Sequence, residues 1–546
     1  MKSNHRNPWS WVPSLYFAEG IPYVIAATTF SLIMYKRLGL SNAEAALYTS
    51  WLYLPWVIKP FWSPFVDIMK TKRWWIVAME LLIGAGLAGV AFCIPLPFFL
   101  QSTLAILWLV AFSSATHDIS ADGFYMLALT ENQQSLFVGI RNTFYRISMI
   151  VGQGALTMLA GHLENTTGLA PVVIKVTNDQ NQTADGGYVQ ADGQGFSYAS
   201  QITFSEAATN TETGNEATCT IKLSQKPEKE IVLNFRQTQG GKSIALVGDE
   251  RFTFNQDNWE EPVTLTFQID PKEKDTVSSE FTGSSGDIPF AWSITFFICA
   301  GLFIALALYH SRILPKPDSD KKAQDNSSVK AFFSSFGSFF KKDGIKFAIA
   351  FILLFRLGEA QLTKIASPFL LDPIQKGGLG LSTEEIGIAY GTVGVLALTI
   401  GGILGGIVAA KDGLRKWIFP MALCMNVPNL LYVYMSAVQP DNYLLVCTMV
   451  GIEQFGYGFG FTAFMLYLIY ISRGTYSTSH YAICTGFMAL GMMLPGMIAG
   501  WIQEQVGYTN FFIWVCLCTI PGLLLVKFME IDPKFGKKEE KEPEHQ

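Results

Sequence analysis

The sequence lacks the short motifs by which many enzymes are identified. It contains no glycine-rich phosphate loop, no nucleophile motif, no nucleotide fingerprint and no cluster of residues at metal-ligand spacing. Cysteine is scarce as well: the chain has eight among 546 residues, and Cys219 is the only one between residues 162 and 287. These absences predict a protein that is not an enzyme, has no catalytic residues, uses no metal or other cofactor, and has no disulfide within that central region.

Charge and hydropathy are distributed unevenly along the chain. The net charge is −5, yet residues 162–287 hold 19 acidic and nine basic residues, whereas the rest of the chain holds 25 acidic and 30 basic ones. The mean hydropathy of +0.28 is therefore an average over two materials. One is a basic, very apolar chain, and the other is an acidic, polar insert.

The apolar chain consists of runs of roughly 20 residues, the length that a helix needs to cross about 30 Å of hydrocarbon. We therefore predict an all-α polytopic membrane protein with 12 transmembrane helices in two six-helix halves, interrupted by a β-sandwich between the fifth and sixth helices. The predicted spans are 13–35, 45–66, 74–92, 104–129, 136–161, 289–310, 344–371, 386–410, 417–438, 443–471, 482–502 and 511–528.

These spans divide the chain into six parts. The predicted parts are helices one to five (1–161), the external insert (162–287), helix six (288–311), a cytoplasmic linker (312–343), helices seven to twelve (344–530) and a charged cytoplasmic tail (531–546).

Lysine and arginine residues predict the orientation in the membrane. If the N-terminus is cytoplasmic, 22 basic residues fall in the loops and tails of that side and only three, Lys36, Arg37 and Lys376, in the short loops of the other. Cytoplasmic loops retain positive charge, so we expect both termini in the cytoplasm of a plasma (inner) membrane protein and a periplasmic or otherwise external insert. The first apolar run is too long for a signal peptide and is expected to remain as an anchor.

The insert has the sequence pattern of an antiparallel β-sandwich. Stretches such as ATCTIKL, EIVLNF and VTLTFQID alternate apolar and polar residues between clusters of Gly, Asn, Asp and Pro. The run RFTFNQDNWEEPVTLTFQIDPKEKD resembles the closing half of a Calx-β or similar immunoglobulin-like module. Because the acids lack the spacing of a 12-residue calcium loop, an ordinary solvated surface is favoured over a calcium site.

Charged residues inside the predicted spans are the first candidates for function. Each one facing lipid costs about 2.5 to 3.5 kcal/mol on the insertion scale, so most of them are expected to face protein or a water-filled cavity. Residues close to span ends, namely Arg141, Lys346 and Lys527, are set apart. The remaining ten are Glu19, Lys59, Glu80, Asp118, Asp122, Arg146, Arg356, Glu359, Lys364 and Glu453.

Spacing suggests how some of these residues act. Asp118 and Asp122 lie one helical turn apart and share a face, so they can hold a proton near neutral pH or bind a cationic group. Arg146 is a natural partner for them, in a structural ion pair or a functional one. Arg356 and Glu359, three residues apart, can pair with each other. Among the others, Glu80 is expected to be structural and Lys59 to reach a membrane surface.

The C-terminal half reads as a degenerate copy of the N-terminal half. The loops SPFVDIMKTKRW and GIVAAKDGLRKW match at a constant separation of 343 positions, and Glu19 and Glu359 stand 340 apart. Two such halves joined by a basic linker resemble the major facilitator superfamily, and the first loop resembles its G-x-x-x-D-x-x-G-R-[R/K] element. That resemblance implies a conformational lock made of Asp67, Lys72 and Arg73, whereas the second loop lacks the acidic residue.

Five segments in order carry a closer resemblance. They are LYFAEGIPY, KPFWSPFVD, SSATHDISADGF, FRLGEAQLTKIASPFLLD and IEQFGYGFGFTAFMLYL, and together they resemble the muropeptide permease (AmpG-type) and acetyl-coenzyme A transporter branch of that superfamily. The resemblance implies proton-driven import of an anionic sugar-peptide of the GlcNAc-anhydroMurNAc-peptide type. With Arg146 added as a candidate, the predicted path for substrate and protons comprises Glu19, Asp118, Asp122, Arg146, Arg356, Glu359 and Glu453.

Alternative functions stay open at this point. The transported solute could be an acyl-coenzyme A or a sugar, or the chain could be a non-transporting receptor or scaffold whose insert binds an envelope partner. The predicted partners are therefore the lipid bilayer, a small solute and protons, with no nucleic acid.

Overall fold

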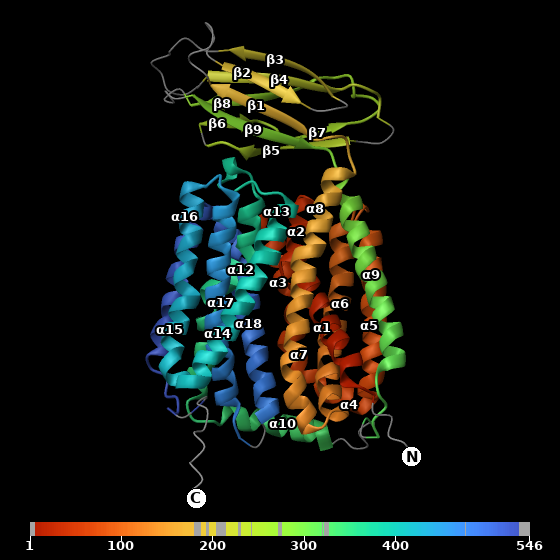
Figure 1. Ribbon diagram of the computed structural model, residues 1–546, viewed down its shortest axis with the longest axis vertical. Coiled ribbons are helices and arrows are strands. Elements are labelled where there is room, and N and C mark those ends of the chain that lie inside the picture. Colours follow the sequence, from red (N-terminus) through yellow and green to blue (C-terminus); the bar gives the residue numbers. More distant parts are fainter. Residues whose placement is uncertain are drawn as a thin grey trace, which may run out of the picture.

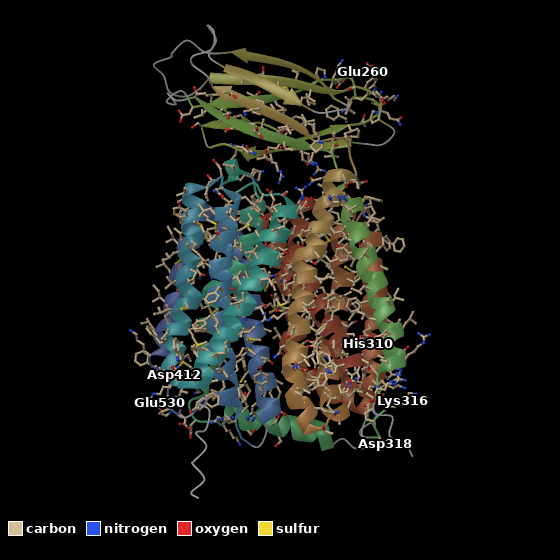
Figure 2. The ribbon with its side chains drawn as sticks, viewed as in Figure 1. Glu260, His310, Lys316, Asp318, Asp412 and Glu530 are labelled. Atoms are coloured by element: carbon tan, nitrogen blue, oxygen red, sulfur yellow. The ribbon has the colours of Figure 1, made fainter. Side chains whose placement is uncertain are left out.

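The protein is a body of helices with a layer of β-strands across one end (Figure 1). The computed structural model describes residues 6–178, 187–192, 196–203, 215–227, 231–241, 243–270, 276–318, 320, 327–474, 477–533 and 535. Glu260, in the turn between two of the strands, lies at the strand-bearing end, whereas Lys316, Asp318, Asp412 and Glu530 lie at the opposite end of the molecule (Figure 2).

The N-terminal half consists of the helices that precede the strands and the one that follows them. They are η1 (Pro8–Ser10), α1 (Val12–Ala27), α2 (Thr29–Arg37), α3 (Asn42–Trp51), α4 (Leu54–Met69), α5 (Lys72–Cys93), α6 (Phe99–Ala128), α7 (Glu131–Met149), the π-helix η2 (Ile150–Ala155), α8 (Leu156–Thr166) and α9 (Ile288–Ile313).

The C-terminal half begins with α10, which lies across the end opposite to the strands (Figure 1). Its helices are α10 (Ser327–Phe340), α11 (Ile345–Phe355), α12 (Leu357–Leu371), η3 (Ile374–Lys376), α13 (Thr383–Ile386), the π-helix η4 (Gly387–Gly394), α14 (Val395–Asp412), α15 (Leu414–Asn426), η5 (Val427–Asn429), α16 (Leu430–Val438), α17 (Tyr443–Ser472) and α18 (Ser477–Val526).

The predicted apolar runs coincide with helical chain, but several of them are interrupted. Seven helical stretches of the described chain are long and apolar enough to cross a membrane, or up to eight if the bent pair Pro8–Ala27 and Thr29–Arg37 forms one span. The longest of these stretches corresponds to the last two predicted runs. The turn that separates the two runs lies within α18, at Gly507, where φ is 76°.

Two helix breaks lie close to predicted site residues. The backbone leaves the helical region at Thr28, between α1 and α2, and again at Arg356, between α11 and α12. A break leaves carbonyl groups without their helical partners. Near the first break, Lys364 donates to the Ala27 carbonyl at 3.4 Å, so the C-terminal half satisfies a backbone group of the N-terminal half.

The strands form two antiparallel sheets with the orders β2-β1-β9-β5-β7 and β3-β4-β8-β6. Their side chains share one buried core, in which the rings of Phe267 and Phe281, from different sheets, lie 4.7 Å apart. The strands are β1 (Val172–Asn178), β2 (Gly187–Asp192), β3 (Phe196–Thr203), β4 (Asn215–Leu223), β5 (Ile231–Gln239), β6 (Ile244–Val247), β7 (Arg251–Phe254), β8 (Val263–Ile269) and β9 (Val277–Ser284).

Packing explains the single cysteine of this region. Cys219 is free and points into the shared core, where burial raises the pKa of its thiol to about 11. The alternation of apolar and polar residues in the insert has a structural counterpart in β8 and β9. In both strands, burial alternates along the chain, with one side chain in two buried over most of the strand. The resemblance to a Calx-β module stays a prediction.

The sheets are anchored in one half and contact the other. They are joined covalently to α8 and α9, but Arg236 of β5 donates to the Gly380 carbonyl at 3.1 Å and Lys376 pairs with Glu250 at 3.3 Å. Burial lowers the pKa of Arg236 to about 10. Gly380 has a positive φ of 67°, and a Cβ there would come within 2.7 Å of the Gln237 carbonyl, so this contact requires glycine.

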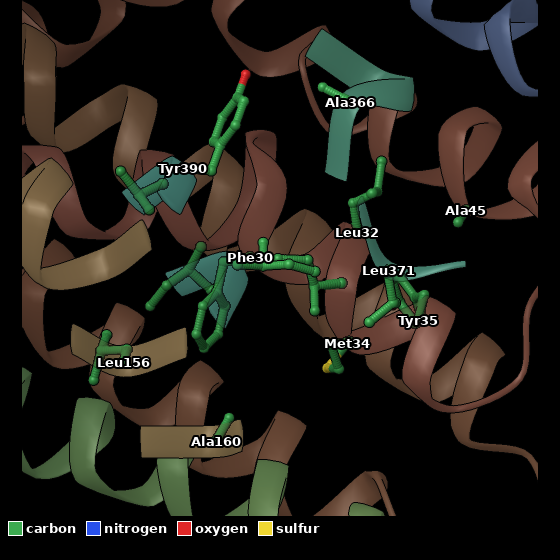
Figure 3. Close-up of a cluster of buried hydrophobic side chains, with 14 of the residues drawn as sticks. Phe30, Leu32, Met34, Tyr35, Ala45, Leu156, Ala160, Ala366, Leu371 and Tyr390 are labelled. Carbon is green, nitrogen blue, oxygen red and sulfur yellow. The ribbon is translucent and has the colours of Figure 1, made fainter. Parts of the chain in front are cut away.

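A buried apolar cluster joins the two halves (Figure 3). Phe30 and Leu156 of the N-terminal half share it with Leu371 and Tyr390 of the C-terminal half. Polar contacts close to the strands reinforce the junction, because Glu164 accepts hydrogen bonds from α2, α9 and α13. The donors are Arg37 at 2.9 Å, Trp292 at 2.7 Å and Thr383 at 2.9 Å.

Candidate functional site

The first candidate site lies around α6, which places Asp118 and Asp122 one turn apart, as the sequence predicts. Asp118 Oδ2 accepts hydrogen bonds from two side chains of α4, Trp56 at 3.1 Å and Lys59 at 3.5 Å. The other oxygen, Oδ1, is buried without a hydrogen-bond partner. Lys59 was expected to reach a membrane surface, but its ammonium group turns to this carboxylate instead.

Asp122 is held by a different set of groups. Its Oδ1 lies 3.1 Å from Arg141 Nη2 and accepts a hydrogen bond from the Tyr16 hydroxyl at 3.1 Å. The Arg141 guanidinium also packs over the rings of Tyr16 and Tyr125, at 4.5 and 5.2 Å from their centroids. Such stacking fixes the guanidinium in place. Arg141 was set apart in the sequence because it lies near a span end, and its pairing is decided by the fold.

Glu19 of α1 completes this group. It lies within electrostatic range of Asp118, Asp122, Lys59 and Arg141, and its Oε2 is buried without a hydrogen-bond partner. We refer to these five residues as the N-terminal cluster. It brings together three of the predicted path residues with two cations that had no predicted place in the path.

Arg146 does not join the aspartates. Its Nη1 donates to Met149 Sδ at 3.6 Å, and its electrostatic neighbours are Tyr145 and Tyr457. Lys59 and Arg141 form the ion pairs with the two aspartates instead. The candidate ion pair is therefore absent, because two cations from α4 and α7 take the positions that spacing alone left open.

The second candidate site lies in the C-terminal half and contains Glu359 of α12 and Glu453 of α17, with 2% and 1% of their surface exposed. Glu359 accepts a hydrogen bond from Thr363 at 3.0 Å, and Glu453 accepts one from Gln454 at 3.0 Å. Each glutamate keeps one buried oxygen without a partner. In the described part of the chain, no lysine, arginine or histidine forms an ion pair with either.

Arg356 stands beside these glutamates without forming an ion pair with them. Its Nη2 donates to the Tyr457 hydroxyl at 2.6 Å, and its guanidinium lies 4.9 Å from the Phe461 ring centroid. The predicted pairing with Glu359 assumes a continuous helix, but the backbone at Arg356 has φ −102° and ψ 12°. The buried Nε of Arg356 has no hydrogen-bond partner. We call Arg356, Glu359 and Glu453 the C-terminal cluster.

Aromatic residues lie between the two clusters. The Tyr23 ring packs edge-to-face on Tyr53 and on Trp56, at centroid distances of 6.2 and 5.2 Å. Trp56 binds Asp118, and Arg356 lies within electrostatic range of both tyrosines. The clusters therefore share one aromatic neighbourhood at the junction of the two halves.

No partners were predicted from the sequence for two further buried residues, Lys364 and Glu80. Lys364, 2% exposed, donates to Thr49 Oγ1 at 3.1 Å and lies over the Tyr53 ring, which makes it a cation at the junction of the halves. Glu80 contacts His117 and His310, neither of which had an assigned role. The available signal was the occurrence of histidine inside apolar runs.

Two of the predicted lock residues, Lys72 and Arg73, lie at the start of α5. The backbone N–H groups of Lys72 and Arg73 donate to the Asp320 carboxylate at 2.8 and 3.1 Å, and the Arg73 side chain donates to the carbonyls of Ser311 and Leu314. These contacts tie α5 to the segment after α9. The side chain of Asp67 lies outside the described part of the structure, so the lock stays a prediction.

Comparison with known proteins identifies relatives among transporters. Residues 19–174 match the BT1 family. A Rickettsia felis protein named as transporter AmpG 4 is 25% identical over 254 residues, which cover 46% of this chain and 58% of that protein. The anhydromuropeptide permease of Escherichia coli K12 is 24% identical over 235 residues, 43% of this chain and 46% of the permease. The chain thus spans about half the length of these curated relatives.

Solved structures extend the comparison over nearly the whole chain. The nucleoside transporter NupG superposes with a TM-score of 0.56 at 12% identity, covering 95% of this chain and 96% of NupG. A D-xylose-proton symporter superposes with a TM-score of 0.56 at 10% identity, covering 96% and 97% of the two chains. The protein is therefore an integral, multi-pass membrane protein that resembles AmpG-type permeases in sequence and has the fold of major facilitator superfamily transporters.

Proposed function

We propose that the protein is a proton-coupled secondary transporter that moves an anionic, muropeptide-like solute across the inner membrane by alternating access. The observation that carries the proposal is the pair of carboxylate clusters within the helical body, one in each half, which meet the same aromatic neighbourhood. Ionisable groups inside a membrane body are costly and mark substrate or proton paths. The name of the E. coli relative supports the choice of substrate class.

The proposal takes the twelve predicted runs as twelve crossings, six in each half, with the two sheets forming an external β-sandwich. Glu260 of the sheets lies opposite to Lys316 and to Asp412 (Figure 2). The predicted cytoplasmic loops would then share one side of the membrane. The inter-half contacts of Glu164 lie on the other side, at the strand-bearing end.

Within this scheme the clusters have different tasks. Glu359, which lacks a cationic partner, would take up and release the proton. Arg356, held on Tyr457 with a free Nε, would bind an anionic group of the solute. Asp118 and Asp122 would sense the proton through their ion pairs with Lys59 and Arg141.

Uptake into proteoliposomes tests the proposal directly. Purified protein is reconstituted, and accumulation of radiolabelled GlcNAc-anhydroMurNAc-tripeptide is measured with and without an imposed pH gradient. We expect accumulation only with the gradient and its collapse on addition of a protonophore. Uptake that is equal under both conditions would refute proton coupling. Parallel assays with acetyl-coenzyme A and with simple sugars test the substrate class.

The two sheets favour a second candidate function, a receptor or scaffold, because they contact the C-terminal half through Gly380. Replacing residues 163–286 by a short linker separates the two functions. Transport that survives the deletion makes the sheets an accessory. If neither version transports and the intact protein binds an external ligand tightly, the receptor function replaces the transporter.

A further inference from the structure

A second buried group of titratable residues lies outside both clusters. It consists of Glu80 of α5, His117 of α6 and His310 of α9, with 0%, 1% and 0% of their side chains exposed. Both imidazoles approach the same oxygen: His310 Nδ1 lies 2.6 Å and His117 Nε2 lies 3.3 Å from Glu80 Oε1. Figure 2 shows His310 in the part of the helical body away from the strands.

The contacts of His310 allow it to be an imidazolium. Its Nε2 lies 2.9 Å from Ser14 Oγ, and the Ser14 hydroxyl lies 3.2 Å from the Trp11 carbonyl. The hydroxyl rotates, so it can donate either to Trp11 or to His310 Nε2. When it donates to Trp11, Nε2 donates to Ser14 and Nδ1 donates to the Glu80 carboxylate, and His310 with two donors is an imidazolium.

Charge balance leads to the same assignment. A carboxylate buried away from water requires a cation, because an uncompensated buried charge is strongly unfavourable. Within the described contacts of Glu80, only the two imidazoles can supply that charge. One imidazolium makes the group neutral, and the 2.6 Å contact singles out His310, since charge-assisted hydrogen bonds are the short ones.

We infer that Glu80, His117 and His310 form a proton-binding site, in which His310 holds the proton and His117 is the exit toward the N-terminal cluster. His117 Nδ1 is buried without a partner and is free to accept a proton when the helices shift. Its direct neighbour in the chain is Asp118, which is in electrostatic contact with it. The inference rests on the proposed function only for the use that transport makes of this proton.

The charged groups that face the site come from each helix packed against α5 and α6. Helix α1 contributes Ser14 and, through the N-terminal cluster, Glu19; α4 contributes Lys59, which is bound to Asp118. The described contacts add no further cation to the Glu80 carboxylate. A change in the partner of Asp118 would therefore alter the field at His117 and link the proton site to the transport cycle.

Histidine NMR tests the inference without requiring a substrate. The chain has six histidines, so ring-¹⁵N-labelled protein in nanodiscs can be assigned with His310→Gln, His117→Gln and His162→Gln. We expect His310 to report two N–H groups at pH 8, where an exposed histidine is neutral. Glu80→Gln should abolish this signal, whereas the ring signals of the exposed His162 should be the same with and without this substitution. A neutral His310 in the parent protein, or an imidazolium that persists in Glu80→Gln, would overturn the inference.

Transport then tests the use of the proton. Gradient-driven accumulation of the muropeptide probe by His310→Gln should fall at least about tenfold, because the variant cannot hold the proton. A tenfold fall corresponds to about 1.4 kcal/mol of lost coupling. The variant His162→Gln is the matched control. Normal accumulation by His310→Gln would overturn the assigned role. If the parent protein transports no solute at all, the proposed function fails, and the NMR titration alone still decides for or against the proton site. Glu80→Asp keeps the carboxylate charge and should keep the His310 imidazolium. This variant separates loss of the carboxylate from misfolding as the cause of a lost signal.

Discussion

The N-terminal and C-terminal clusters both hold carboxylates within the helical body, but they differ in whether a cation pairs with those carboxylates. In the first, the two aspartates each have a cation, since Lys59 lies 3.5 Å from Asp118 and Arg141 lies 3.1 Å from Asp122, and among the described contacts only Glu19 has no ion pair. In the second, Glu359 and Glu453 accept hydrogen bonds only from a hydroxyl and an amide. A buried carboxylate without a cation favours its neutral, protonated form. Under the proposed function, we therefore expect the aspartates of the first cluster to stay charged and the glutamates of the second to exchange protons.

The C-terminal cluster also contains a cation, Arg356, that could pair with a glutamate, but in the described contacts it forms no ion pair with Glu359 or Glu453. Arg356 is turned to Tyr457 and Phe461, because the helix breaks at this residue. If the proposed function is right, Arg356 can therefore bind an anionic solute while Glu359 binds a proton. Two neighbouring groups of opposite sign that are not paired with each other would allow the binding of solute and of proton to be coupled.

The largest expected effect is that of Glu359→Gln. The substitution mimics permanent protonation, so gradient-driven accumulation should fall at least about tenfold while the protein still folds, because no ion pair is lost. The accumulation ratio in proteoliposomes measures this effect, and Glu260→Gln in the exposed turn between β7 and β8 serves as control. Full accumulation by Glu359→Gln would remove the proposed distinction between the two clusters.

Breaking an ion pair of the N-terminal cluster should cost stability instead. Lys59→Met leaves Asp118 without its cation, and we expect a loss of about 1 to 3 kcal/mol, less than for a fully buried pair because Lys59 is 29% exposed. Thermal unfolding in detergent measures the effect. The double variant Lys59→Met/Asp118→Asn should regain most of the loss. If it is as unstable as Lys59→Met, the stabilising role of the pair is wrong.

Arg356→Lys probes the free guanidinium of the C-terminal cluster. Lysine keeps the charge but cannot present a planar group to Tyr457 and Phe461 at the same time as an anion. We expect the KM for an anionic solute to rise about five- to tenfold, with a smaller change in the maximal rate. Uptake kinetics measure both. An unchanged KM would place the anionic group of the solute elsewhere, with Lys364 as the next candidate.

The smallest effect is expected for Glu453→Gln. The glutamine is isosteric and carries no charge into the buried site, so the protein should gain up to about 1 kcal/mol of stability at pH 8. Melting curves at pH 8 test the sign. A loss of stability at pH 8 would mean that Glu453 is ionised and has a cationic partner.

Local patterns in the sequence carried much of this description. Runs of apolar residues predicted the helices, because a helix in hydrocarbon satisfies its own backbone and needs only length and composition. Period-two alternation predicted strands in the insert, and Cys219 could form no disulfide inside it. The buried acids also followed, since a charge within an apolar run is conspicuous whatever surrounds it.

Partners between helices were decided only by the tertiary structure. Arg146 and Arg141 lie five residues apart in α7, and no local rule distinguishes which one reaches Asp122. The breaks at Thr28 and Arg356, and the convergence of His117 and His310 on Glu80, likewise depend on how distant helices pack. The sequence by itself determined which charged residues fall within the apolar runs. The fold decided what each of them faces, because side chains of different helices meet only where packing brings them together.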